Sequence, residues 1–260
     1  MDFRLIRYAA GERVARITLN RADKRNALDE SMVGELTSAF AAAARDANIK
    51  VVVLAAAGPA FCAGADIVQM ERMSTYDLEQ NRTDSLRLAT LFRTMYEIRK
   101  PVIALVHGPA LAGGCGLASV CDFVLAARER ATFGYTEVHA GFVPAIVSVY
   151  LAKRIGEGRA RELILRGKII SATEAEAIGL ITAAVDDDQL ETMGTELVQE
   201  LIAQNSATAM GMAKEMLGKM NGMNLADAMD FAVNVNAAAR MTADCKKGIQ
   251  SFLQKQKPQW

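Results

Sequence analysis

The stretch IALVHGPALAGGCGLASVCDF, residues 103–123, decides the fold. It begins with an apolar strand at 103–106, bends at Ala112, Gly113 and Gly114, and continues as a helix of small and apolar residues. Because no side chain in the bend exceeds a methyl group, a ligand can lie against the unpaired N–H groups of the helix N-terminus, where the macrodipole favours negative charge. Such groups can stabilise an oxyanion, although a crossover that uses glycine only for packing has the same pattern.

A second stretch repeats this pattern upstream. The apolar residues 51–54 lead into GPAFCAGAD, residues 58–66, and Gly58-Pro59-Ala60 recurs as Gly108-Pro109-Ala110. A repeated strand–loop–helix unit predicts stacked turns, and stacking would bring the two loops side by side. Two such loops could offer two N–H groups to one carbonyl as it turns into an enolate.

Both stretches resemble the crotonase superfamily, also called the enoyl-CoA hydratase/isomerase family, and the resemblance covers essentially the whole chain. Four segments carry it: 20–28, which holds Asn20-Arg21 and Asn26-Ala27-Leu28, then FCAGAD at 61–66, residues 103–123, and FGYTE at 133–137. The resemblance implies an α/β fold, a spiral of ββα turns with a C-terminal helical appendage. It also implies that the N–H groups of Ala65 and Gly113 bind the thioester carbonyl of an acyl-CoA.

The resemblance further implies which residues contact the substrate. The turn that carries Lys24 and Arg25 would lie near the coenzyme A phosphates. The full expected set is Lys24, Arg25, Ala27, Ala63, Ala65, Asp66, Ile67, Gly113 and Gly116. Asp66 could instead only cap the helix that follows its loop. No separate cofactor is implied, because coenzyme A arrives with the substrate.

One departure from the family pattern bears on the chemistry. Hydratases of this type usually supply two glutamates; Glu137 matches one of them, and Gly116 occupies the position of the other. Glycine cannot transfer a proton, and a positioned acid or base contributes about 10²–10⁴ in rate. The absence of the second carboxylate should therefore slow hydration or redirect the reaction.

Several accounts of this departure remain open. Glu137 could hydrate a short or branched 2-enoyl-CoA alone, as in the bacterial enoyl-CoA and methylglutaconyl-CoA hydratase-like proteins that the segment EVHAGFVPA, residues 137–145, resembles. Glu137 could instead shuttle a proton between Cγ and Cα, as in a double-bond isomerase. His139 or Tyr135 could replace the missing carboxylate. The chain could also be a non-catalytic acyl-CoA-binding protein.

Composition narrows the classes of partner. The 260 residues hold 30 basic and 30 acidic side chains, so the formal net charge is zero and nothing indicates a nucleic-acid or membrane partner. The 4 cysteines show no paired spacing and indicate free thiols in a reducing compartment, and 2 histidines without clustered ligands argue against a metal site. Charges near the N-terminus interrupt any signal-peptide core, so a cytoplasmic location is expected.

The remaining pattern predicts the order of elements. We expect a hairpin over 3–19 with Gly11-Glu12 at its turn, and the C-terminal part as helices broken near 205 and 221. The other expected elements are a helix over 29–46, a strand over 50–55, a helix after Tyr76, strands over 102–106 and 122–126, a segment over 133–137 that enters a helix, a helix over 157–166, a helix capped by Ser171 and Glu174, and a last helix that ends at Pro258. We divide the chain into a spiral core, 1–190, and a helical region, 191–260, that would build a homotrimer or a dimer of trimers.

Overall fold

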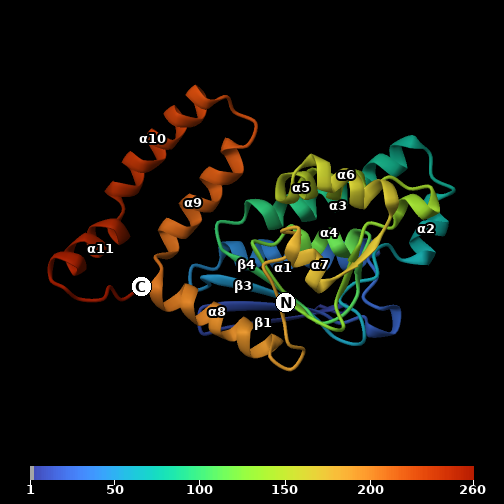
Figure 1. The fold of residues 1–260 in the computed structure, drawn as a ribbon, viewed down its shortest axis with the longest axis horizontal. Helices are drawn as coiled ribbons and strands as arrows, with labels where there is room; N and C mark the ends of the chain where they lie inside the picture. Colours follow the sequence, from blue (N-terminus) through green and yellow to red (C-terminus); the bar gives the residue numbers. More distant parts are fainter. Residues whose placement is uncertain (1–2) are drawn as a thin grey trace.

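Two β-sheets form the body of the protein in a computed structural model that describes residues 3–260 (Figure 1). The larger has six strands in the order β1-β2-β3-β4-β6-β9, and the smaller has three in the order β5-β7-β8. The bounds of the larger sheet are β1 Ile6–Gly11, β2 Val14–Leu19, β3 Val51–Ala56, β4 Val102–Val106, β6 Phe123–Ala127 and β9 Ala183–Val185. Those of the smaller are β5 Ala110–Leu111, β7 Thr132–Gly134 and β8 Ile169–Ser171.

Helices cover both faces of the larger sheet. Their bounds are α1 Glu30–Arg45, α2 Ile67–Met73, α3 Leu78–Glu97, α4 Gly113–Ser119, α5 Ala145–Ile155, α6 Glu157–Arg166, α7 Ala172–Ala177 and α8 Leu190–Gln204, with short 3₁₀ helices η1 Ala22–Lys24 and η2 Glu137–Ala140. Helix α8 contacts β3, β4 and β6, whereas α1 contacts β1 and β2. In Figure 1, α8 lies on one side of the strands and α3, α5 and α6 lie on the other. The central strands β3 and β4 are apolar throughout, as expected of parallel strands covered on both faces, and all of β4 is buried.

Successive turns of the chain each contribute to both sheets. Strand β4 of the larger sheet is followed by β5 of the smaller sheet and by α4, and β6 is followed by β7 and η2. The turn before them follows the same course, because Cys62, downstream of β3, forms a parallel bridge with Ala110. The predicted stacking of the two loops and the predicted α/β spiral are therefore confirmed.

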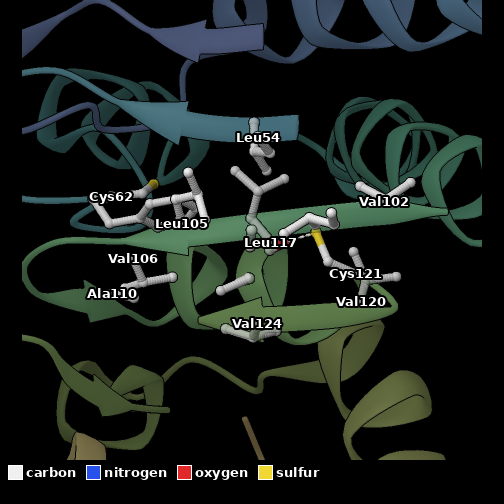
Figure 2. Packing of buried hydrophobic residues seen from close by; sticks show 14 of the residues in the cluster. Leu54, Cys62, Val102, Leu105, Val106, Ala110, Leu117, Val120, Cys121 and Val124 are labelled. Atoms are coloured by element: carbon white, nitrogen blue, oxygen red, sulfur yellow. Dashed lines mark hydrogen bonds between the residues drawn. The ribbon is translucent and has the colours of Figure 1, made fainter. Parts of the chain in front are cut away.

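The apolar core fills the space between these turns. Leu54 of β3, Leu105 of β4, Leu117 of α4 and Val124 of β6 gather in one buried cluster (Figure 2). Since α4 buries almost its whole length in this cluster, the short helix is held rigidly against both neighbouring strands.

Several local predictions differ from the structure. The hairpin turn lies at Glu12 and Arg13, both with positive φ, one residue beyond the predicted position. The segment after β7 enters η2 rather than an α-helix, because Gly141 ends that turn in a left-handed conformation and Pro144 precedes α5. Helix α2 and the short strands β5, β8 and β9 were not predicted, and the last helix ends at Leu253, before Pro258.

The C-terminal helices leave the body. Helix α9 (Ala207–Met220) contacts α3, whereas α10 (Leu225–Met241) and α11 (Ala243–Leu253) stand away from the body in Figure 1 and α8 packs on the sheet. The division at residue 191 stays a prediction. No helix within residues 3–260 has both the length and the apolar composition to span a bilayer.

Candidate active site

The two glycine-bearing loops are in direct contact. The amides of Phe61 and Cys62 donate to the Pro109 carbonyl at 3.0 and 3.2 Å, and the Leu111 amide donates to the Cys62 carbonyl at 2.9 Å. Gly64 has a φ of 92° and lies so close to the second loop that a Cβ on it would be 2.8 Å from the Ala112 Cβ and 3.5 Å from the Gly113 nitrogen. The two predicted amide donors are thus on adjoining backbone segments.

The backbone at Ala112 has an unusual conformation. Its φ of 49° and ψ of −126° belong to a region that residues with a Cβ rarely adopt, and such strain is found where the surrounding structure requires it. Ala112 precedes Gly113, the first residue of α4, so its conformation sets the direction of the Gly113 N–H. Within residues 3–260, neither the Ala65 nor the Gly113 N–H donates to a protein acceptor. Both remain free to bind a ligand atom.

A buried asparagine fixes the first loop, and the sequence analysis gave this residue no role beyond the family resemblance. Asn26 is 0% exposed, and its Nδ2 donates to the Ala57 and Ala60 carbonyls at 2.8 and 2.9 Å. Its Oδ1 accepts from the Arg21 amide at 2.9 Å. The signal available in the sequence was a polar residue with turn propensity beside an apolar pair.

Arg21 is a second residue whose role the sequence analysis missed. Its Nη1 lies 2.8 Å from Asp66 Oδ2, and its Nη2 lies 3.3 Å from Asp29 Oδ2. Asp66 also accepts from the amides of Val68 and Gln69, so it caps α2. Burial by itself would raise the pKa of Asp66, but the Gln69 amide and Arg21 outweigh that effect and lower it. Asp66 is therefore an ionised structural cap.

Glu137 reaches the same region from η2. Its Oε2 is buried and has no hydrogen-bond partner among the described residues. Desolvation by burial raises the pKa of this carboxyl above its ordinary value, and a hydrogen bond from its own backbone opposes the shift only in part. An unpartnered carboxyl whose pKa is raised by burial in a cavity is a candidate for proton transfer.

Gly116, the position of the missing carboxylate, is enclosed by apolar side chains. A Cβ on Gly116 would lie 2.2 Å from Val147 Cγ1 and 3.1 Å from Phe92 Cε1. Val147, on α5, is itself buried and occupies the space into which a side chain at 116 would project. The structure therefore has no room for a carboxylate there unless Val147 also changes.

A cavity of about 400 Å³ joins these elements. Of the expected site residues, Ala63, Ala65, Gly113 and Glu137 line it. Its walls also include Leu28 and Val33, side chains of α2 and α3, and the segment from Phe142 to Val147. A largely apolar cavity of this size with a few convergent polar groups is typical of a small-molecule site.

The other expected residues lie around the cavity without lining it. Lys24 and Arg25 are exposed on and just after η1, and the Arg25 carbonyl accepts from the Ala63 amide at 3.0 Å. Ile67 is 82% exposed at the start of α2, and Ala27 is buried. These contacts with coenzyme A stay predictions, as does the one assigned to Gly116.

His139 and Tyr135, the two candidates for replacing the second carboxylate, bond to other parts of the protein and not to the cavity. His139 Nε2 lies 3.3 Å from the Arg166 carbonyl oxygen, and His139 does not line the cavity. Tyr135 is buried with its hydroxyl 2.8 Å from Ser119 Oγ, and burial raises its pKa well above the ordinary value. Neither group is placed to act on a molecule in the cavity.

A second, larger cavity of about 680 Å³ lies between α9 and the body. None of the expected site residues lines it; of its charged groups, Lys214 pairs with Asp122 at 2.6 Å and Arg154 donates to carbonyls of the core. The smaller cavity is therefore the candidate active site.

Comparison with known proteins shows the family of the chain. The sequence model of the family described as enoyl-CoA hydratase/isomerase matches residues 9–260. A Thermus thermophilus protein named as an enoyl-CoA hydratase is 40% identical over 247 residues, which cover 95% of this chain and 97% of that protein. The mitochondrial enoyl-CoA hydratase of Pongo abelii is 34% identical over 94% of this chain and 82% of its own. The crystal structure of a Mycobacterium smegmatis enoyl-CoA hydratase superposes with a TM-score of 0.93 at 31% identity, with 99% of each chain covered.

Proposed function

The chain belongs to the enoyl-CoA hydratase/isomerase family, and on that premise we propose that it reversibly hydrates a short or branched 2-enoyl-CoA with Glu137 as the proton-transfer residue. One observation carries the proposal: the unpartnered carboxyl of Glu137 lines the same cavity as Ala65 and Gly113, whose N–H groups are free. The names of the relatives and this carboxyl count against the non-catalytic alternative.

The two amides would act on the thioester. Donation from the Ala65 and Gly113 N–H groups to the carbonyl oxygen polarises the conjugated double bond, which makes Cβ electrophilic and stabilises the enolate that follows addition. Because both donors are backbone groups in rigid, contacting loops, they need no reorganisation when charge develops. The strained conformation of Ala112 supports this proposal, since it sets the direction of the second donor.

Glu137 would transfer both protons. Its carboxylate takes a proton from water as the oxygen bonds to Cβ, and the resulting carboxylic acid returns a proton to Cα of the enolate. The net change is the addition of one water across the double bond. A raised pKa supports this role, because one group must act first as a base and then as an acid.

Coenzyme A would bind as part of the substrate, with no separate cofactor. Lys24 and Arg25 support a site for its phosphates, since both are exposed and the Arg25 carbonyl accepts from the amide of Ala63, which lines the cavity. Ala27, Ala63, Ile67 and the ordered loop around Asp66 would form the neighbouring contacts.

Isomerisation is the second candidate, and a specific observation favours it. Val147 fills the space beside Gly116, so only one carboxylate reaches the cavity from this side. One base is sufficient to move a proton from Cγ to Cα of a 3-enoyl-CoA, whereas hydration also requires a bound water.

Incubation of the purified protein with crotonyl-CoA tests the proposal. We expect the enoyl absorbance to fall and 3-hydroxybutyryl-CoA to form. Conversion of 3-hexenoyl-CoA to 2-hexenoyl-CoA without a hydroxyacyl product would identify an isomerase instead. Absence of turnover with a panel of 2- and 3-enoyl-CoAs would contradict both.

The C-terminal helices would assemble the protein as a homotrimer or a dimer of trimers. Within α10 and α11, every residue of which is described, no residue is buried, and Leu225, Val233 and Phe252 are among the exposed apolar residues. A second copy of the chain would cover this surface. Light scattering would measure the assembly, and a monomer at micromolar concentration would contradict it.

A further inference from the structure

Helices α2 and α3 form a polar wall on the cavity. Gln69 of α2 is only 7% exposed, and its Nε2 donates to Asp84 Oδ1 of α3 at 2.9 Å. Both residues line the cavity. A buried amide thus holds one oxygen of Asp84 and fixes the carboxylate at the wall.

The charges at the cavity are unbalanced. Its lining includes the carboxylates of Asp29, Glu30, Asp84 and Glu137, whereas Arg87 is its only cation among the described residues. Arg87 Nη1 lies 3.0 Å from Glu30 Oε1, so its charge is already paired. Asp84 has no ion-pair partner within residues 3–260. Asp84 therefore presents to the cavity a carboxylate that no ion pair within the described residues offsets.

The proposed function places the acyl group next to this wall. If the thioester carbonyl binds Ala65 and Gly113, the acyl chain would occupy the rest of the cavity, whose lining includes two surfaces, one from α2 and α3 and one from residues 142–147. The second of these surfaces is mostly apolar and can accept an uncharged chain.

From this geometry, and resting on the proposed function, we infer that Asp84, held by Gln69, makes the enzyme select enoyl-CoA substrates with an uncharged acyl group over those that carry a second carboxylate. Like charges brought together in a partly desolvated site disfavour the wrong partner, which is how many proteins achieve specificity. The inference separates this chain from the methylglutaconyl-CoA hydratase-like proteins that residues 137–145 resemble, because a glutaconyl group has a free carboxylate.

Two substrates of equal chain length test the inference. In 2-pentenoyl-CoA the fifth carbon is a methyl group, and in glutaconyl-CoA it is a carboxylate. For the wild-type enzyme we expect kcat/KM to favour 2-pentenoyl-CoA by at least about tenfold. Asp84→Asn keeps the shape and removes the charge, so the ratio of kcat/KM for glutaconyl-CoA to that for 2-pentenoyl-CoA should rise by about tenfold.

Two further variants locate the effect. Glu79→Gln removes an exposed carboxylate from the same helix, outside the cavity, and should change kcat/KM for neither substrate. Gln69→Leu removes the donor that holds Asp84 and should reduce the preference between the two substrates.

The outcomes separate this inference from the proposed function. Equal kcat/KM for both substrates, or an unchanged ratio in a folded Asp84→Asn variant, overturns the inference while hydration of 2-pentenoyl-CoA upholds the proposed function. If neither substrate is turned over, calorimetric titration with pentanoyl-CoA and glutaryl-CoA decides the matter, because the same preference must then appear in Kd and must weaken in Asp84→Asn.

Discussion

Two neighbouring elements, η2 and α4, border the cavity and contribute to it in opposite ways. Element η2 contributes a side chain, the carboxyl of Glu137, which burial leaves without a partner. Helix α4 contributes a backbone group, the N–H of Gly113, and where a side chain could project, at Gly116, it is covered by Val147. The comparison teaches that, under the proposed function, η2 would supply proton transfer, whereas α4 would supply only a backbone donor that stabilises charge.

Replacement of the reactive group on η2 should have the largest effect. Glu137→Gln removes the proton-transfer group while it keeps the size of the side chain, so we expect turnover to fall by about 10²–10⁴. Affinity for a saturated acyl-CoA should change little, because the amides of α4 and the first loop are intact. Steady-state kinetics together with calorimetric binding measure the two effects, and unchanged turnover would remove Glu137 from the mechanism.

A matched pair of substitutions tests the backbone contribution of α4. Gly113→Pro deletes the N–H and should reduce kcat by about 10²–10³. Gly113→Ala keeps the N–H, and its Cβ would meet only Leu28 Cδ1 at 3.5 Å, so it should retain most activity. Circular dichroism and thermal unfolding must show that both variants fold. An equal reduction of kcat in both variants would mean that the Gly113 N–H does not stabilise the transition state.

The covered face of α4 can be probed through stability. Gly116→Ala places a methyl group against Val147, and such overpacking should lower the free energy of unfolding by about 1–3 kcal/mol. In a Val147→Ala background the same substitution should cost less, because the contact at 2.2 Å with Cγ1 is gone. Urea unfolding of the four proteins in this cycle measures the coupling. Strictly additive effects would show that the two residues do not compete for one space.

The smallest effect is the pH dependence of Glu137. Because burial raises its pKa, the acid limb of kcat/KM for hydration, which needs the carboxylate, should lie above the ordinary glutamate pKa of about 4.3. The folded state then binds the proton more tightly than the unfolded state. The contribution of Glu137 to stability is therefore greatest below the unfolded pKa and falls as the pH rises through the folded pKa. Urea unfolding should show that the free energy of unfolding of Glu137→Gln rises relative to that of the wild type as the pH increases. A difference in free energy of unfolding that is constant with pH would contradict the raised pKa.

Much of the fold and part of the site could be predicted from residues that leave few alternatives. The repeated Gly-Pro-Ala and the small residues at 112–114 predicted the contacting loops, because these patterns specify backbone geometry locally. Glu137 was expected only because the FGYTE segment resembles that of the family. The helix predicted after residue 137 was corrected because of residues that end helices. Gly141 and Pro144 separate η2 from α5, and both could be read in the sequence.

The features that could not be predicted arise from contacts between distant segments. Nothing in the sequence places Val147 against Gly116, Arg21 between Asp29 and Asp66, or Gln69 beside Asp84. Each pairing joins different elements, so it depends on the packing of the spiral rather than on local propensity. The positive φ of Ala112 could not be predicted either, because alanine favours negative φ and the surrounding loops impose the observed value.

The methyl group of Ala112 improves the packing between the two loops and at the same time makes the backbone conformation of this residue unfavourable. A glycine at 112 would adopt the observed φ and ψ without strain, yet it would leave a gap at the seam where a Cβ on Gly64 would otherwise meet this methyl. The Ala112 methyl group therefore fixes the contact between the two loops, while the backbone of Ala112 is strained. Glycine at 112 would relieve the backbone but loosen the contact between the loops, so the strain at this residue and the fixed direction of the Gly113 amide have the same origin.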